Sequence, residues 1–318
     1  MKKFAKGCLI AALSMLTIGV IILAVCTFIG GTKIYAYAQD EIKNNPYVED
    51  LFVDVDDFFG GDIVSWHHGE MHMSFDHNYP THSGDDQDFQ AALASDVSNL
   101  NLEIGAGSCI ISESDDAYFH IYSKNAGKYQ YYTENGTFHV RGFDHNGKGV
   151  HVGEYNEIYL EIPKNVLFES IEIELGAGKI EADSLLASGR INMEIGAGEL
   201  EVNTLNANWF NVDLGVGDME VKNGSVNDSE VNIGMGEMTY SGRITGDFTA
   251  ECGFGDLDLY LDDSVNDHNY ELDCSVGDIT LNQTNYSGIS YTEKINNNAD
   301  STYAIECAGG KITIDFKK

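Results

Sequence analysis

Carboxylates recur at a fixed place in this chain, and their spacing is the first feature that could do chemistry. Eight short glycine-containing motifs can be aligned on their last glycine. The residues four positions before that glycine are then Glu103, Glu174, Glu194, Asp213, Asn232, Glu251, Asp273 and Glu306. Oxygen ligands suit hard divalent cations such as calcium. We therefore expect a cation-attracting column whose candidate residues are Glu174, Glu194, Asp213, Glu251 and Asp273.

A second acidic set directly follows the aligned glycine, at Glu199, Asp218, Glu237, Asp256 and Asp278. If such residues stack about 4.8 Å apart, neighbouring unit charges repel by roughly 0.9 kcal/mol in water and about 3–4 kcal/mol at an effective dielectric of 20. The surface should then raise some carboxylate pKa values or gather cations. The alternative is a solvated face that only keeps strands soluble. No loop has the EF-hand spacing, so a specific metal stays unknown.

Histidines form the second candidate site, because five of the ten lie between residues 67 and 82, beside Trp66 and Glu70. Imidazoles with carboxylates can bind zinc or copper. The residues we single out are His67, His68 and His72. Structural zinc sites show fixed ligand spacings, which this tract lacks, so an unstructured solvated stalk is the competing interpretation.

No catalytic motif accompanies these residues, and we expect neither enzymatic activity nor a cofactor. The chain has no G-x-S-x-G, phosphate loop or H-E-x-x-H. Stacked acids resemble the paired carboxylates of glycosidases, which keeps a polysaccharide-acting enzyme open as an alternative. With 51 acidic and 18 basic residues the formal charge is −33, which excludes a nucleic-acid partner.

The elements that must position the acids are read from the repeat itself. Gly-x-Gly motifs end at Gly107, Gly178, Gly198, Gly217, Gly236 and Gly255, followed by degenerate copies ending at Gly277 and Gly310. From Gly178 the steps are 20, 19, 19, 19, 22 and 33 residues. Such a period indicates stacked supersecondary units. Apolar residues fill positions −5, −3, +2 and +4, the pattern of strands with one buried face.

The alternation changes phase across each glycine pair, so one residue must be absorbed there by a corner or bulge. Glycine permits the backbone dihedrals that this requires. We predict an all-β fold, a β-solenoid of parallel rungs with about 19–20 residues each. An antiparallel roll or prism of the same strands is the alternative. The two degenerate copies should form the C-terminal cap.

Three regions follow from the pattern. Residues 1–31 are a cytoplasmic tip and a transmembrane helix, 32–94 are an acidic, His-rich stalk with a short helix at 34–42, and 95–318 are the β-repeat domain. A meander of strands interrupts the repeat at 112–168, with a hairpin turn at Asn135-Gly136.

The uncharged run from Cys8 to Ile29 is long enough as a helix to span a bilayer core of about 30 Å. More lysines precede the run than closely follow it, which places the N-terminus in the cytoplasm and the remaining chain outside. A signal peptide cleaved near Ala36-Tyr37-Ala38 and a lipoprotein signal at Cys26 are the alternatives.

Four further cysteines, Cys109, Cys252, Cys274 and Cys307, stand in apolar columns of the repeat. We expect buried thiols that pack as small apolar side chains. If their rungs are adjacent, Cys252, Cys274 and Cys307 come within range of a disulfide, which is the alternative for an exported chain.

The anchor, the segment Ile158 to Lys164 (I-Y-L-E-I-P-K) and the recurring LGAG, IGAG and CGFG units together resemble the putative-adhesin β-strand-repeat family of unknown function, found mostly in Gram-positive envelopes. The resemblance covers roughly residues 95–318 and implies a membrane-tethered β-repeat domain, sometimes linked to envelope stress systems. It implies no catalytic residues. We expect an extracytoplasmic binding module whose partners are cationic envelope proteins, peptides or divalent ions, with a purely structural spacer as a further alternative.

Overall fold

The structure is a computed structural model that describes residues 64–67, 70–73, 75, 78–144, 157–164, 166–287 and 290–317. The chain divides into two compact units, one of residues 1–70 with 145–154 and one of residues 71–144 with 155–318. A separate two-stranded sheet pairs β1 (Val64–His67) with β2 (Glu70–Met73). The strands β3 to β17 belong to the second unit.

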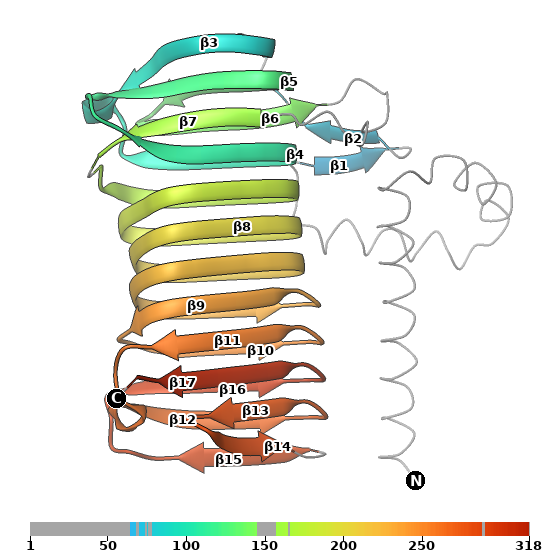
Figure 1. Cartoon of the computed structure of the whole chain (residues 1–318), viewed down its shortest axis with the longest axis vertical. Coiled ribbons are helices and arrows are strands. Elements are labelled where there is room, and N and C mark those ends of the chain that lie inside the picture. The colour runs from blue at the N-terminus through green and yellow to red at the C-terminus, as the bar shows by residue number, and fades with distance from the viewer. Residues whose placement is uncertain are drawn as a thin grey trace, which may run out of the picture. The chain divides into compact units, whose positions relative to one another are not determined.

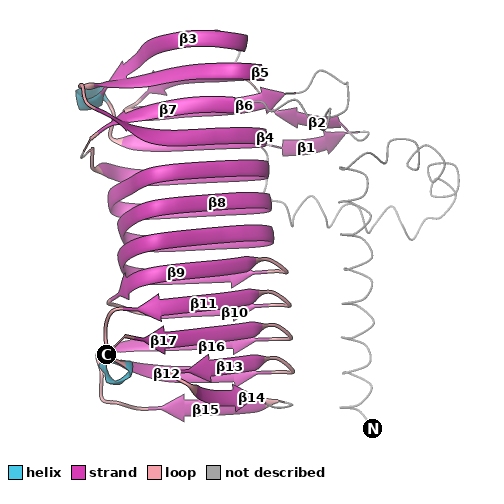
Figure 2. Cartoon of the chain, viewed as in Figure 1, coloured by secondary structure: helices cyan, strands magenta, loops and turns pink. Residues whose placement is uncertain are grey.

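The second unit is built of β-strands in a single 15-stranded sheet (Figure 2). Two short 3₁₀ turns, η1 (Ala94–Asp96) and η2 (Val265–Asp267), lie between strands. The strands are β3 (His82–Leu93), β4 (Asn99–Ser114), β5 (Tyr118–Glu134), β6 (Thr137–Asp144), β7 (Glu157–Pro163), β8 (Phe168–Ile233), β9 (Glu237–Ile244), β10 (Phe248–Cys252), β11 (Asp256–Leu261), β12 (His268–Cys274), β13 (Asp278–Leu281), β14 (Thr284–Ser287), β15 (Tyr291–Ile295), β16 (Ser301–Cys307) and β17 (Lys311–Phe316).

Parallel pairing in register stacks the repeats, as predicted. β8 continues for 66 residues and winds through several rungs, where a rung is one turn made of two strands joined at a glycine corner (Figure 1). Its first turn lies on β4 with Leu102 opposite Ile173 and Cys109 opposite Ile180. The rungs of β9, β10 and β11 continue this parallel register. The antiparallel roll is therefore wrong for the repeats. Among strands β3 to β17, antiparallel pairing is confined to the two ends of the stack.

The core lies between the two strands of every rung. Side chains at the predicted inward positions are almost completely buried, including Leu214 (2% exposed) and Ile233 (3%) in consecutive rungs. Larger rings fill the core of later rungs, where Phe248, Tyr270 and Tyr303 are each at most 1% exposed. Because fully burying one such side chain stabilises the fold by about 1.5–3 kcal/mol, columns of them hold neighbouring rungs together.

The corner glycines are required mainly by the close approach of one rung to the next. A Cβ atom added to Gly215 would lie 2.7 Å from the carbonyl oxygen of Gly196, and one on Gly253 would lie 2.8 Å from that of Gly234. Unusual dihedrals, the reason expected from the sequence, apply at Gly107 (φ +138°) and Gly178 (φ +131°). Backbone contact thus explains why glycine recurs in every regular corner.

The segment predicted as an interruption, 112–168, instead builds the N-terminal end of the stack. β6 and β7 together form one more parallel rung on β4. β5 runs antiparallel across both of them, and β3 runs antiparallel along β5. β3 lies within 82–93, inside the region predicted as stalk, so ordered structure of this unit extends into that region.

The C-terminal end departs from sequence order. β16 pairs in parallel with β10 on one side and β12 on the other, and β17 lies between β11 and β13 in the same way. The last rung of the sequence is therefore inserted one place before the end of the stack. The outermost rung, β12 with β13, is covered by the antiparallel strands β15 and β14. These two strands, rather than the degenerate repeats, form the cap.

In the described part of the chain, no helix is long and apolar enough to cross a membrane. The predicted transmembrane segment, from Cys8 to Ile29, and the short helix at 34–42 lie outside the described residues.

Candidate functional site: two columns of carboxylates

The predicted column at position −4 runs the length of the stack on its outward face. Glu103 lies opposite Glu174, and Glu251 lies opposite Asn232 on one side and Glu306 on the other. Because the last rung is inserted, Asp273 follows Glu306 instead of Glu251. We call this set the first acidic column, in the spatial order Glu103, Glu174, Glu194, Asp213, Asn232, Glu251, Glu306 and Asp273.

At the Glu103 end of the first acidic column, an arginine forms an ion pair with the carboxylate. Arg141 of β6 lies opposite Glu103, with its Nε 2.9 Å from Oε2 and its Nη2 3.0 Å from Oε1. Glu103 is only 2% exposed, and burial raises the pKa of its carboxyl despite the opposing effect of Arg141. The guanidinium therefore balances the first charge of the column.

Among the described residues, no lysine or arginine lies within 4.0 Å of the carboxylates of the next two rungs, Glu174 and Glu194. Burial, followed by the charges of Glu103 and Glu194, raises the pKa of Glu174 to about 7. Burial also raises the pKa of Glu194, and the nearby charges of Asp213 and Glu172 act in the same direction. A carboxyl with these neighbours is neutralised by a proton or by a bound cation more readily than an isolated one.

Asn232 divides the first acidic column. Its Nδ2 donates a hydrogen bond to Oδ1 of Asp213 at 2.9 Å, so an amide replaces what would be a further repulsion between carboxylates. Beyond it, Glu251, Glu306 and Asp273 are exposed. Within the described residues none of these three has a lysine or arginine within 4.0 Å.

The predicted acidic set after the glycine forms a second acidic column. Asp218, Glu237 and Asp256 lie opposite one another in consecutive rungs, and all are exposed. Lysines stand at both ends of this run. Lys179 pairs with Glu199 at 3.1 Å, and Lys311 of the inserted rung lies between Asp256 and Asp278 in register.

Neither column forms a preorganised metal cage. Among the residues that the structure describes, no group of three or more His, Cys, Asp or Glu side chains is arranged to hold a metal ion. The columns instead offer single carboxylates one rung apart, which attract cations through their summed field.

The histidine cluster cannot be placed in this way. His67 belongs to β1 and His72 to β2, but their side chains, and His68 as a whole, lie outside the described residues.

The four cysteines of the repeats are buried thiols, as expected, and no disulfide joins them. The inserted rung places Cys307 between Cys252 and Cys274 in register. Each Sγ donates to the carbonyl of the glycine three residues later, at 3.0 Å from Cys252, 3.1 Å from Cys307 and 2.8 Å from Cys274. The thiols therefore stabilise the corners from inside the core.

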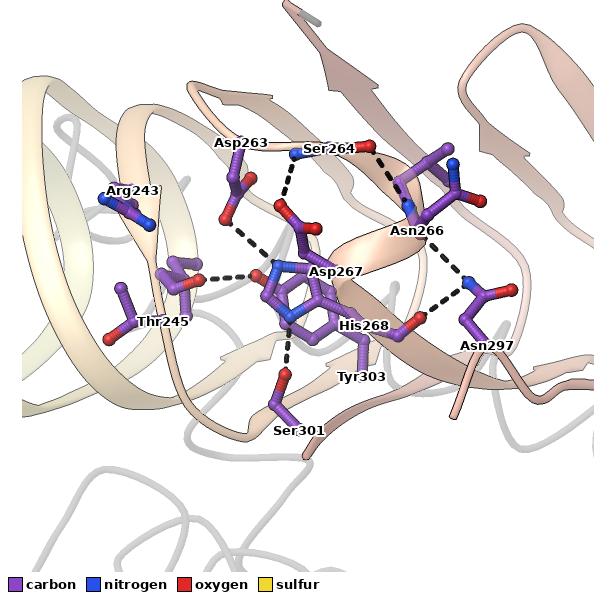
Figure 3. A network of polar contacts seen from close by, with 12 residues as sticks. Arg243, Thr245, Asp263, Ser264, Asn266, Asp267, His268, Asn297, Ser301 and Tyr303 are labelled. Atoms are coloured by element: carbon purple, nitrogen blue, oxygen red, sulfur yellow. Dashed lines mark hydrogen bonds and ion pairs between the residues drawn. The ribbon is translucent and has the colours of Figure 1, made fainter. Parts of the chain in front are cut away.

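A buried cluster of Asp263, His268 and Ser301 was not predicted from the sequence. His268 Nε2 lies 3.0 Å from Asp263 Oδ2, and its Nδ1 lies 2.6 Å from Ser301 Oγ (Figure 3). Both His268 and Ser301 stand nine residues before their aligned glycine. In the other repeats that position holds polar residues or glycine that are not buried, so the sequence pattern gave no signal for the cluster.

These three residue types also make nucleophilic triads, but here they are enclosed. Their exposed fractions are 6% for Asp263, 2% for His268 and 7% for Ser301, and Oδ1 of Asp263 has no hydrogen-bond partner. The ring of Tyr303 stacks on the imidazole at 4.2 Å. His268 of β12 lies opposite Ser301 of β16, so the cluster ties the outermost rung to the inserted one. We assign it a stabilising role.

Stacked parallel rungs with outward carboxylate columns define an all-β repeat domain. The chain belongs to the Toastrack family, DUF4097, whose model matches residues 97–295. No curated protein matches the chain.

Solved bacterial structures align with it at low identity. A putative adhesin from Bacteroides fragilis is 14% identical, covering 74% of this chain and 96% of that one, with a TM-score of 0.41. A putative cell adhesion protein from Clostridium sporogenes is 16% identical, covering 73% and 100%, with a TM-score of 0.33. A putative lipid binding protein from Parabacteroides distasonis is 12% identical, covering 72% and 96%, with a TM-score of 0.28.

Proposed function

We propose that the protein is a membrane-anchored, extracytoplasmic binding module that acts by surface contact, without catalysis, and that its partners are cationic. Those partners are divalent ions, basic peptides or basic envelope proteins. The proposal places the β-repeat domain outside the cell, attached through the apolar segment from Cys8 to Ile29. Fractionation of intact cells tests the location: the chain should sediment with membranes, and external protease should degrade the domain.

One observation carries the proposal. The first acidic column places Glu174 between two further carboxylates, where burial and their charge raise its pKa to about 7. A binding partner that brings positive charge would relieve this repulsion, so the free energy of the column favours cation binding. The overall charge of −33 extends the attraction beyond the contact itself.

Calcium provides the simplest test. Adding millimolar calcium to the protein should raise its melting temperature, because an ion that binds only the folded state stabilises it. The triple variant Glu174→Gln, Glu194→Gln, Asp213→Asn should lose most of this rise.

A matched control removes three carboxylates that already lie beside lysines, through Glu181→Gln, Glu201→Gln and Glu271→Gln. This control has the same net charge as the column variant and should keep the calcium response. An unchanged melting temperature in the unmodified protein across the whole concentration range would remove divalent ions from the proposal.

A further inference from the structure

Three corners of the stack present one apolar side chain between two carboxylates. The segments read Glu194-Ile-Gly-Ala-Gly-Glu199, Asp213-Leu-Gly-Val-Gly-Asp218 and Glu251-Cys-Gly-Phe-Gly-Asp256, and two further corners differ only by Asn232 and Ser275. The residue between the two glycine positions points away from the core. We call these residues the corner ridge: Ala197, Val216, Met235, Phe254 and Val276.

Backbone hydrogen bonds hold the corner ridge in line. Met235 N donates to the carbonyl of Gly215 at 2.9 Å, and Phe254 N donates to that of Gly234 at 2.8 Å. The ladder thus continues through the corners, so these side chains follow one another at the rung spacing of about 4.8 Å. Their size rises along the stack from alanine through valine and methionine to phenylalanine.

The inserted rung leaves room for the ring of Phe254, the largest side chain of the corner ridge. Its corner is bare glycine at Gly309, and a Cβ added there would lie 2.6 Å from Cε1 of Phe254. The phenylalanine ring therefore rests over Gly309 and remains 50% exposed, while Val276 on the following rung is 72% exposed. Val216 and Met235 on the preceding rungs are half-buried, so the corner ridge is an apolar strip that is most exposed at Phe254 and Val276. An exposed apolar strip of this kind indicates a contact surface.

Charge on both sides of the ridge selects the partner. Asp218, Glu237 and Asp256 flank it on one side, and the described residues place no lysine or arginine within 4.0 Å of any of the three. Glu251 flanks Phe254 on the other side. A second copy of this chain, at −33, would be repelled, and so would an anionic membrane.

We propose that the corner ridge binds a basic amphipathic helix of a partner polypeptide, lying along the stack. The apolar stripe of a helix repeats about every 5.4 Å, close to the rung spacing of about 4.8 Å, so it can cover Val216, Met235 and Phe254 in succession. Lysines or arginines on either side of that stripe then meet the two acidic columns. The inference rests on the proposed function and specifies its partner and its site.

The test uses the full chain in zwitterionic nanodiscs, with empty nanodiscs as the blank. The probe is a fluorescent 18-residue peptide of leucine and lysine whose leucines occupy one helical face. A permuted peptide of the same composition and a plain oligo-lysine are the comparisons. Fluorescence anisotropy should show the amphipathic peptide binding about tenfold or more tightly than the permuted one, since apolar anchors dominate interface energies.

Paired variants separate the apolar contact from the charge. The double variant Met235→Ser, Phe254→Ser should abolish the preference for the amphipathic peptide, while Trp209→Ser should not, because Trp209 is 41% exposed and lies seven residues before Val216 on an extended strand. Asp256→Asn should weaken the binding of all three lysine-containing peptides. Asp300→Asn, an equal change of charge in an exposed turn, should leave their binding unchanged.

The outcomes are distinct. Equal binding of the amphipathic and permuted peptides, or equal loss in Trp209→Ser and the ridge variant, would overturn the helix proposal while oligo-lysine binding still supported a cationic partner. If neither oligo-lysine nor calcium bound, the proposed function itself would fail. Melting temperatures equal to that of the unmodified protein establish that the substitutions leave the fold intact.

Discussion

Replacing Glu174 by glutamine should make this protein more stable, although it removes a charged surface residue. In the folded chain burial and the charges of Glu103 and Glu194 raise its carboxyl pKa from 4.5 to about 7. The folded state then binds a proton more tightly than the unfolded state does. Folding is favoured while the group is protonated, and this contribution is lost as pH rises from about 4.5 to about 7.

The magnitude follows from the difference in pKa. A rise from 4.5 to about 7 is about 2.5 units, which corresponds to about 3.4 kcal/mol as an upper bound. Glu174 is only half-buried, so solvent screening reduces the expected effect to about 1–2 kcal/mol. Glu174→Gln should therefore raise the free energy of unfolding by about 1–2 kcal/mol at pH 8 and change it little at pH 4.5.

Urea unfolding, followed by circular dichroism in the presence of a chelator, measures the free energy of unfolding of the variant and of the unmodified protein at pH 8 and at pH 4.5. Glu201→Gln is the control, because Lys222 lowers the pKa of Glu201 and its removal should decrease stability at pH 8. If Glu174→Gln were neutral or destabilising at pH 8, the carboxylates of the first acidic column would not repel one another, and the argument for cation binding would lose its basis.

Three further outcomes are expected. Gly215→Ala should lower the melting temperature sharply because its Cβ would meet a backbone carbonyl, whereas Val216→Ala in the same corner should be tolerated. Ser301→Ala should cost about 1–3 kcal/mol in urea unfolding by leaving the imidazole of His268 short of a hydrogen bond; labelling by a serine-reactive phosphonate in the native protein would contradict the stabilising role. Deleting residues 301–318 should expose β12 to β15 to limited proteolysis while β4 to β9 stay resistant, and uniform resistance would show that the inserted rung is dispensable.

The sequence predicted the repeating part of the fold because its information is local. Alternation of apolar residues sets which side of each strand is buried, and the fixed step sets which residues face one another. Leu214 and Ile233 are buried in consecutive rungs for these reasons. The first acidic column follows from the same periodicity, one residue away from a buried position.

The pairing order of the strands at the two ends of the stack could not be predicted from apolar alternation and the repeat period. The strand β16 could stack beyond β12 as the outermost rung, or it could insert between β12 and β10, as it does in the structure. The alternation of apolar residues is the same in both arrangements, so it does not decide between them. Likewise, the sequence predicted residues 112–168 to be an interruption because these strands lack the Gly-x-Gly corner. In the structure β6 and β7 form one further rung on β4, and β5 covers that rung. His268 and Ser301 are brought together only by that late insertion, so no local motif announced them.

The position of the last rung also constrains how this chain can be made. When a ribosome has released everything up to β15, the strand that must lie against β10 has not yet been synthesised, and β12 carries a similar apolar pattern with Cys274 where β16 has Cys307. A nascent chain therefore either leaves that edge open or pairs it with a substitute that must later be displaced. Formation of this end of the stack then waits for β16 and β17, and a chain truncated before Ser301 would have an unsatisfied edge rather than a slightly shorter stack.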